Sequence, residues 1–331
     1  MAASVAPDRL TTGTVTREAS RRDLLAVVAQ SGKPYYDEAS DLTARASYYA
    51  SIDANLAPAA LFDELHQLVS STHTNWLDYD AARHLYPWVD LRPSLRLQSI
   101  YSAQSVATDD PVRRPTDSPK LFKRSRSGMK RLEARMSRRE EVFRQAEDWI
   151  KALSSAPTDA ATLASRIALV EAANYFNCEH AVPQVLFDRQ EPMRGDLHHL
   201  FTAERDINAV RSNRPLADFP EYEGKPIQGA EPEGYAPAEQ PGFEPAGGKG
   251  PMARAVLYFM VRYPWVLKGA GELGYDHAEL EILRRWSRED PPGLYEKHRN
   301  AETQAQQGNR NPFVDHPEWV DRVDFSLALV D

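Results

Sequence analysis

The sequence predicts an α+β fold in which helices dominate and a small sheet completes one main domain over residues 46–326. Apolar residues recur at helical spacing between Leu61 and Val69, the pattern of a helix with one face in the core. Apolar and polar residues alternate over 95–101, the period of a half-buried strand. Asp276 and Glu279 have the spacing of a capping box that opens another amphipathic helix. These observations together indicate the α+β class.

Composition limits what kind of protein this is. The chain has 331 residues, of which 42% are hydrophobic and 27% charged, as in an ordinary globular protein with a sizeable core. No run reaches the about 18 apolar residues that a membrane-spanning helix needs, so we expect no membrane partner. Cys178 is the single cysteine, which excludes an intramolecular disulfide and a zinc site built from several cysteines. We take a monomer as the working expectation.

The N-terminal residues 1–45 are expected to form a flexible arm with at most one short helix. Within it, Ser20 to Leu25 faintly resembles a twin-arginine export leader and is followed by four apolar residues. That apolar stretch stops at Gln30 and Lys33, short of the roughly 7 to 15 residues of a leader's apolar region. We therefore favour a helix start and residence in the cytoplasm, with export as the alternative.

Charge is distributed unevenly along the chain. The net charge is −8, yet the segment from Arg113 to Arg144 holds 12 Lys and Arg against 4 Asp and Glu. Apolar residues from Leu132 to Leu153 form one helical stripe, so a basic helical insertion is expected over about 113–155. This segment could clamp nucleic acid through phosphate contacts, present a solvated face paired with acids, or recruit an acidic partner. The residues leave these three alternatives open.

The rest of the chain is expected to alternate helices and loops. A helix runs through Leu163 to Val170, and a Pro-, Gly- and Glu-rich stretch at about 216–250 reads as an exposed loop. A helix over 253–263 should end before Pro264, because proline cannot continue it. A helix starting near Leu294 should end at Gly308, and residues 307–311 should pack beneath the site described next.

Chemistry-bearing side chains are concentrated between residues 177 and 213. Glu179 and Asn208 offer the oxygen ligands that Mg²⁺ prefers, and His180 offers a base with an ordinary pKa of about 6.5. Neighbours on a strand point to opposite faces, so Glu179 and His180 can share a site only if the backbone bends or the reacting water spans between them, and we expect a bend. On a helix, Glu204, Asn208 and Arg211 share one face, which would direct Asn208 to metal and Arg211 to phosphate.

Five sequence blocks resemble the endonuclease I family and occur in family order. They are NCEHAVPQ at 177–184, DLHHL at 196–200, NAVRSN at 208–213, FEPAGGKGPMARAVLYFMVRY at 243–263, and the run from WSREDPP at 286 to Val320. The resemblance covers roughly residues 47–325. It implies a His-Me finger (ββα-metal) core and largely sequence-nonspecific endonuclease activity on DNA, with RNA as a further plausible substrate.

The resemblance also implies roles for individual residues. His180 activates the attacking water, while Glu179 and Asn208 hold one Mg²⁺, for which Mn²⁺ could substitute. The ion stabilises the leaving 3′ oxygen, so the products end in 5′-phosphate. Intact Glu179, His180 and Asn208 favour an enzyme over the alternative of a catalytically silent nucleic-acid-binding protein on the same scaffold.

Other residues have supporting roles with open alternatives. Arg211, a catalytic candidate, and Arg254 are candidates for binding phosphates, the alternative being structural ion pairs with acids. His198, His199 and Asn177 are expected to support the site from behind its ligands. The chain is expected to depart from the family in three ways: we expect no leader and no disulfide, it has Pro251 where Asp is common, and its basic segment looks like an insertion.

Overall fold

The structure is a computed structural model that describes residues 34–86, 88–93, 97–101, 176–222, 234–236, 241–270 and 274–329. The expected basic insertion, the expected helix at 163–170 and the leader-like stretch lie outside these residues. No helix in the described ranges is both long enough and apolar enough to cross a membrane. The described elements are mainly helices with two small sheets, which confirms the α+β class.

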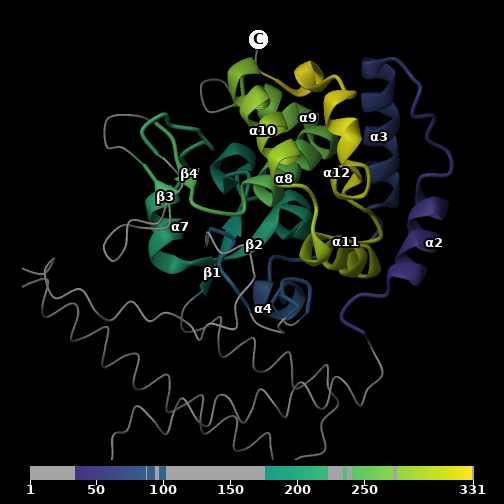
Figure 1. Cartoon of the computed structure of the whole chain (residues 1–331), viewed down its shortest axis with the longest axis horizontal. Coiled ribbons are helices and arrows are strands. Elements are labelled where there is room, and N and C mark those ends of the chain that lie inside the picture. Colours follow the sequence, from purple (N-terminus) through teal and green to yellow (C-terminus); the bar gives the residue numbers. More distant parts are fainter. Residues whose placement is uncertain are drawn as a thin grey trace, which may run out of the picture.

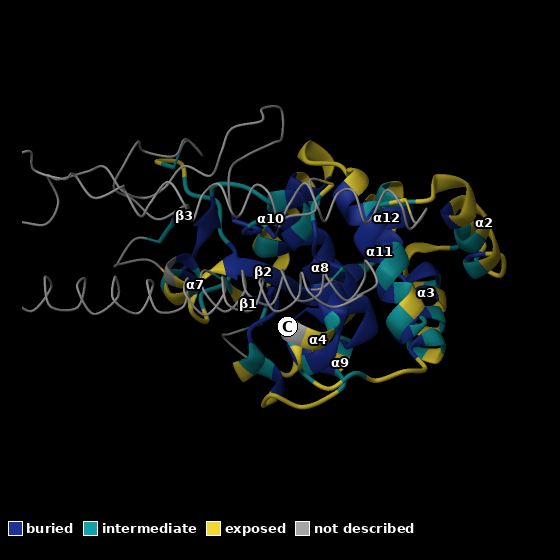
Figure 2. Cartoon of the chain, turned by 90° about the horizontal axis from the view of Figure 1, so that it is seen from below, coloured by how far each residue is buried: buried dark blue, intermediate teal, exposed yellow. Residues whose placement is uncertain are grey.

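Helix α8 (Lys249–Arg262) runs through the middle of the molecule, and nearly all of its residues are buried (Figures 1 and 2). It packs against α3 (Pro58–Thr72), α10 (His277–Glu289) and α12 (Pro312–Asp315). Pro264 separates it from α9 (Pro264–Lys268), as predicted, because a proline ends one helix yet fits the first turn of the next. A helix surrounded in this way buries residues on every side, and most of those in α8 are apolar, with Arg254 and Arg262 as the buried charged exceptions.

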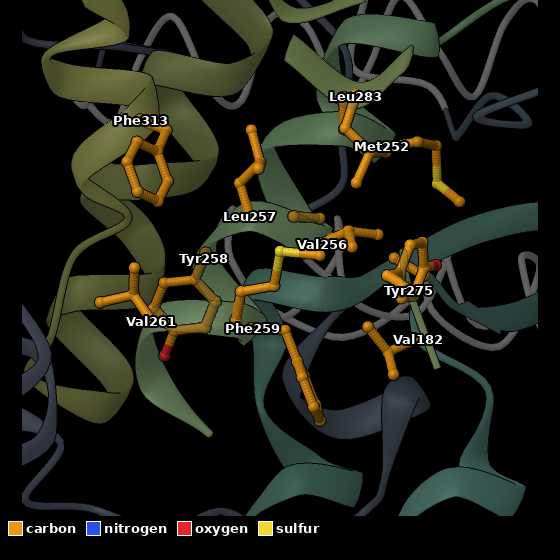
Figure 3. Packing of buried hydrophobic residues seen from close by; sticks show 14 of the residues in the cluster. Val182, Met252, Val256, Leu257, Tyr258, Phe259, Val261, Tyr275, Leu283 and Phe313 are labelled. Atoms are coloured by element: carbon orange, nitrogen blue, oxygen red, sulfur yellow. The ribbon is translucent and has the colours of Figure 1, made fainter. Parts of the chain in front are cut away.

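The core around α8 reaches the segment that carries the site. Figure 3 shows Val256 and Phe259 of α8 in a cluster with Leu283 of α10 and Phe313 of α12. Val182 belongs to the same cluster and lies only two residues after His180. Burial of side chains of this size stabilises each by about 1.5–3 kcal/mol, so the chain beyond His180 is held firmly in place.

The sheet that carries the site has two antiparallel strands, β1 (Phe176–His180) and β2 (Leu200–Glu204), with Glu179 paired to Phe201. Helix α7 (Arg205–Arg211) follows β2 directly and contacts both strands. The strand predicted over 95–101 is wrong for its described part, since Leu97 to Tyr101 form no strand. Ile100 still lies beside β2 and donates its N–H to the Thr202 carbonyl at 2.8 Å.

Two other expectations need correction. The arm at 1–45, expected to be flexible with at most one short helix, ends in α2 (Glu38–Tyr48), and this helix packs on the rest of the chain because its Asp41 is buried and forms an ion pair with Arg310. The stretch at 216–250, expected to be an exposed loop, contains β3 (Gly234–Tyr235) paired with β4 (Glu244–Pro245). Phe243, next to β4, is fully buried, so part of this stretch belongs to the core.

The helix ends predicted from local signals are confirmed. Asp276 and Glu279 form both hydrogen bonds of the capping box at the start of α10. Helix α11 (Leu294–Gln307) ends at Gly308, which has a φ of 96° that other residues rarely adopt. The remaining short helices are α4 (Ala81–His84), η1 (Gln184–Phe187), η2 (Met193–Gly195), η3 (Leu197–His199), η5 (Pro317–Asp321) and η6 (Phe325–Ala328).

Candidate active site

Glu179 and His180 are the last two residues of β1, and the chain bends directly after them at Ala181 and Val182. The bend expected from the adjacent acid and imidazole therefore lies immediately beyond His180. Ala181 donates its N–H to the His199 carbonyl at 2.9 Å, and both Ala181 and Val182 are fully buried. The end of the strand is thus held both by the sheet and by the core.

A cleft of about 490 Å³ opens at this strand end. Glu179 and His180 line it from β1, and Asn208 and Arg211 line it from α7, so the structure brings these four predicted residues together. The other lining residues come from β1, from η1 with its flanking turns, and from the chain after α7: Cys178, Pro183, Gln184, Val185, Asp188, Arg189, Ser212 and Asn213.

The imidazole of His180 is held in one tautomer by the chain itself. Its Nε2 lies 3.0 Å from the carbonyl oxygen of Arg194. A carbonyl can only accept, so Nε2 carries the hydrogen and Nδ1 of the neutral ring is the nitrogen that can take a proton. Burial, followed by the neighbouring His199, lowers the pKa of His180 well below its ordinary value. The ring is therefore neutral near pH 7 in the absence of other ligands.

Arg194 is placed by a small network on the far side of His180. Glu191 accepts the N–H of Gly195 at 2.6 Å and the N–H of Tyr79 at 3.2 Å, which joins two loops. The ring of Tyr79 lies 5.1 Å from that of His180 and beneath the guanidinium of Arg194. A side chain at Gly195 would overlap the Leu77 carbonyl, so this close approach requires glycine.

Glu179 is buried and paired with Arg211. The Arg211 Nη1 lies 2.6 Å from the Glu179 Oε1 and also donates to the His180 carbonyl at 2.9 Å. Burial raises the pKa of the Glu179 carboxyl above its ordinary value, while the Arg211 guanidinium acts in the opposite direction. Arg211 is itself only 2% exposed, so it faces the protein more than the cleft, which differs from its predicted role on phosphate.

Asn208 presents its side-chain oxygen, because its nitrogen is occupied. The Asn208 Nδ2 donates to the Cys178 carbonyl at 3.3 Å, which leaves Oδ1 as the end that can bind a cation. One carboxylate and one amide oxygen suit Mg²⁺, which keeps several waters and takes few protein ligands. The described residues contain no group of three or more His, Cys, Asp or Glu that could hold an ion, so a metal here would depend on Glu179 and Asn208.

The two histidines of the DLHHL block are buried and bonded to backbone. His199 Nε2 lies 2.5 Å from the Met193 carbonyl, and His198 Nε2 lies 3.2 Å from the Asn309 carbonyl. Burial lowers the pKa of His198 to about 4, so it is neutral near pH 7. Neither histidine lines the cleft. Asn177, the third residue expected to support the site, accepts the N–H of its neighbour Cys178 at 2.9 Å.

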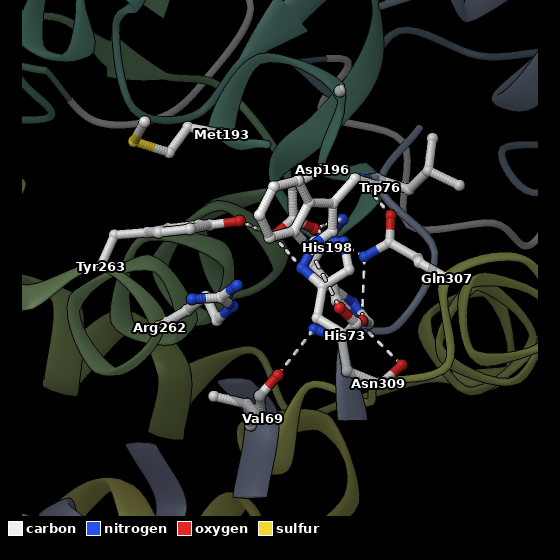
Figure 4. A network of polar contacts seen from close by, with 12 residues as sticks. Val69, His73, Trp76, Met193, Asp196, His198, Arg262, Tyr263, Gln307 and Asn309 are labelled. Atoms are coloured by element: carbon white, nitrogen blue, oxygen red, sulfur yellow. Dashed lines mark hydrogen bonds and ion pairs between the residues drawn. The ribbon is translucent and has the colours of Figure 1, made fainter. Parts of the chain in front are cut away.

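Sequence reasoning did not single out Asp196, which organises the layer beneath the site (Figure 4). Its fully buried carboxylate accepts hydrogen bonds from the hydroxyls of Tyr258 at 2.8 Å and Tyr263 at 2.9 Å. Gln307 donates to its other oxygen at 2.8 Å and the Asn309 carbonyl lies 3.2 Å from His198, so these two residues of the segment 307–311 pack against the DLHHL block. Asp196 shares the DLHHL block with the histidines, but the sequence alone does not reveal its distant partners.

Arg254 is part of a buried ion pair. Its Nε and Nη2 contact the two carboxylate oxygens of Glu296, and its Nη1 donates to the Ser287 carbonyl at 3.0 Å. The side chain is fully buried and does not line the cleft. Arg254 therefore forms a structural ion pair, which was the alternative left open by the sequence. The predicted contact of Arg254 with phosphate is corrected accordingly.

Arg189 is a cation at the cleft that sequence reasoning missed. It is exposed, and no described residue forms a hydrogen bond or ion pair with its guanidinium. Both Asp188 and Arg189 adopt positive φ, 50° and 56°, a conformation that costs roughly 1–2 kcal/mol per residue. Such strain often accompanies function. The only sequence signal was an arginine that closely follows the NCEHAVPQ block.

Comparison with known proteins places these residues in context. The family model described as Endonuclease I matches residues 135–318 of the chain. The "Extracellular ribonuclease" of Bacillus amyloliquefaciens is 30% identical over 148 residues, which cover 39% of this chain and 46% of that protein. The "Extracellular ribonuclease" of Bacillus subtilis (strain 168) is 31% identical over 145 residues, with the same two coverages of 39% and 46%. An "Extracellular deoxyribonuclease" of Aeromonas hydrophila is 28% identical over 163 residues, 43% of this chain and 67% of that protein.

The matches extend over part of each protein. The chain spans about half the length of the curated relatives it matches first. The matched range of the family model, in contrast, is more than half of this chain and contains the whole of the cleft.

Proposed function

Because this chain belongs to the endonuclease I family, we propose that it is a metal-dependent nuclease that hydrolyses phosphodiester bonds within nucleic acid with little sequence preference. The observation that carries the proposal is the meeting of Glu179, His180 and Asn208 in one open cleft. The names of the relatives, ribonucleases and deoxyribonucleases, support both DNA and RNA as substrates. Endonuclease I nucleases are generally metal-dependent, which agrees with the donor atoms present.

We propose that β1, β2 and α7 form a His-Me finger. The last residues of β1 supply the acid and the imidazole, β2 pairs with β1, and α7 follows β2 and supplies the amide. The direct contacts of α7 with both strands support this assignment. In such a unit the site depends on a short, local piece of chain, and the helices around α8 serve as its rigid base.

In the proposed site, Glu179 and Asn208 would hold one Mg²⁺, or Mn²⁺ in its place, through a carboxylate oxygen and the Asn208 Oδ1. When bound, the ion would stabilise negative charge on the phosphate and on the leaving 3′ oxygen, which favours products with 5′-phosphate. Arg211 occupies the Glu179 Oε1, so Oε2 is the candidate ligand atom. Waters and phosphate oxygens would supply the remaining ligands.

His180 would accept the proton of the attacking water at Nδ1. The Arg194 carbonyl keeps the hydrogen on Nε2, so the ring cannot turn its protonated nitrogen toward the water without losing that bond. After proton transfer both ring nitrogens carry hydrogen, and the same carbonyl dipole stabilises the resulting cation. A positioned base of this kind contributes typically about 10² to 10⁴ in rate.

Plasmid nicking tests the proposal. The wild-type protein should relax and then degrade supercoiled plasmid with Mg²⁺ or Mn²⁺, and a chelator should stop it. His180→Ala should lose hydrolysis while retaining nucleic-acid binding in a gel-shift assay, because only the proton acceptor is removed. His277→Ala, which changes an exposed histidine of α10, is the matched control and should cut normally.

Two outcomes would contradict the proposal. A protein that shifts plasmid mobility but never cuts it with either ion would be a catalytically silent binder. Full turnover by His180→Ala would remove His180 from its role and leave the identity of the base open.

A further inference from the structure

We propose that Arg211 is a positioning residue that fixes the two metal ligands relative to each other, so that metal affinity depends on its guanidinium. This inference rests on the proposed function, because it concerns the same cleft. It replaces the phosphate-binding role that the helical spacing of Asn208 and Arg211 suggested.

The contacts of Arg211 are all directed at one short piece of chain. Its Nη1 contacts the Glu179 Oε1 at 2.6 Å and the His180 carbonyl at 2.9 Å, and its Nη2 contacts the Ala181 carbonyl at 2.7 Å. A single planar group therefore binds three consecutive residues. With 2% of its surface exposed, it offers little to an incoming phosphate.

These acceptors run from the end of β1 into the bend that follows it. The His180 and Ala181 carbonyls belong to successive peptides, so binding both of them fixes the orientation in which the strand turns away. The Glu179 carboxylate is held at the same time, by one of its two oxygens. Arg211 consequently determines where the candidate ligand on β1 lies.

The second ligand is carried by the same helix as Arg211. Asn208 lies three residues earlier in α7, nearly one turn away, and donates to the Cys178 carbonyl of β1. Arg211 and Asn208 together join the C-terminal turn of α7 to the end of β1. Because Arg211 supplies the charged contacts of this junction, removing them should loosen the spacing between Glu179 and Asn208.

Lysine cannot reproduce this arrangement. Its ammonium is a point charge on a flexible stem, whereas the guanidinium presents several N–H donors in a fixed plane. Arg211→Lys should keep the positive charge beside Glu179 but lose at least one of the two carbonyl contacts. The substitution therefore tests whether metal affinity depends on the position of the ligands or only on the positive charge beside them.

The experiment measures Mn²⁺ binding without nucleic acid, by calorimetry and by the spin-resonance signal of free Mn²⁺. Groups that orient metal ligands typically contribute about 10- to 100-fold to affinity, so Arg211→Lys should weaken binding by that factor. The KM for DNA at saturating Mn²⁺ should change by less than about twofold, because no phosphate contact is removed. Arg211→Gln, which keeps one amide donor, is the second variant if the lysine variant does not fold.

The matched control is Arg310→Lys. Arg310 is also fully buried and pairs with Asp315 and Asp41, but it does not line the cleft. It should lower the midpoint of thermal unfolding without changing Mn²⁺ affinity. A merely structural Arg211 would behave in the same way as Arg310, and that result would overturn the inference.

Two further outcomes are informative. Unchanged Mn²⁺ affinity with a raised KM in Arg211→Lys would restore a phosphate role and overturn the inference while leaving the nuclease proposal intact. A wild-type protein that neither binds Mn²⁺ nor cuts nucleic acid would instead refute the proposed function itself.

Discussion

Asp196→Asn should destabilise the fold by removing the charge at the centre of the layer beneath the cleft (Figure 4). The Asp196 Oδ2 accepts from the hydroxyls of Tyr258 and Tyr263. Its Oδ1 accepts from the Gln307 side chain at 2.8 Å and from the His198 N–H at 3.1 Å. The carboxylate is fully buried, so water cannot replace these partners.

The expected magnitude follows from the donors around the new amide. Asparagine has one oxygen that accepts and one nitrogen that donates, so one pair of partners must face a nitrogen. With the nitrogen at the Oδ1 position, the Gln307 amide and the His198 N–H, which are both donors, would each face another donor in place of an acceptor. With the nitrogen at Oδ2, the hydroxyls of Tyr258 and Tyr263 could rotate and accept. A hydrogen bond to a charged group contributes about 1.5–3 kcal/mol and a neutral one about 0.5–1.5 kcal/mol, so even in this second orientation the weakening of all four bonds should lower the free energy of unfolding by about 3 kcal/mol or more.

Urea unfolding followed by tryptophan fluorescence measures this loss. Asp63→Asn changes an exposed carboxylate on α3 and should stay within about 0.5 kcal/mol of wild type. If Asp196→Asn also unfolded within about 1 kcal/mol of wild type, the hydrogen bonds of the buried carboxylate would not have the assigned weight. Folded Asp196→Asn protein should still bind Mn²⁺, because Asp196 does not line the cleft.

Three other results are expected. Arg189→Ala should raise the KM for nucleic acid about tenfold with little change in kcat, because an open cation is lost from the cleft, while Arg322→Ala, an exposed arginine elsewhere, should leave KM unchanged. Burial lowers the pKa of His198 to about 4, so the unfolded chain takes up the proton first as the pH falls below about 6.5. The contribution of His198 to the free energy of unfolding should therefore decline by about 3 kcal/mol between pH 6.5 and 4, and a flat urea-unfolding profile there would contradict this. Gly308→Ala should destabilise by more than about 1 kcal/mol, since φ is 96° and a Cβ would overlap the Thr72 carbonyl, whereas Gly293→Ala meets open space and should be nearly neutral.

The amino-acid sequence alone predicted those features whose signal lies within a few neighbouring residues. The capping box at Asp276, the helix end at Gly308 and the break at Pro264 depend on hydrogen bonds and backbone angles within a few residues, and all three are present. The order of the five sequence blocks likewise led to the endonuclease I family, which the family model confirms. The acid, imidazole and amide named from those blocks do line one cleft.

Alternation of apolar residues was not enough to predict the sheet. The segment at 97–101 has the period of a strand, but strands need partners, and β2 pairs with β1 instead. Ile100 contributes a single backbone bond at that edge. Pairing is a contact between segments distant along the chain, so periodicity in one segment does not decide it.

The arginines show most clearly that the sequence alone does not reveal contacts between distant segments. Arg254 and Arg211 have the residue type that binds phosphate, yet Arg254 is bound to Glu296, 42 residues away, and Arg211 to Glu179, 32 residues away. Arg189, which the sequence did not mark, also lines the cleft and is the only exposed one of these three. Residue type and local spacing determined which groups could do the chemistry. Only the tertiary structure decided which of them are available, because a charge is neutralised or left free by neighbours that come together when the chain folds.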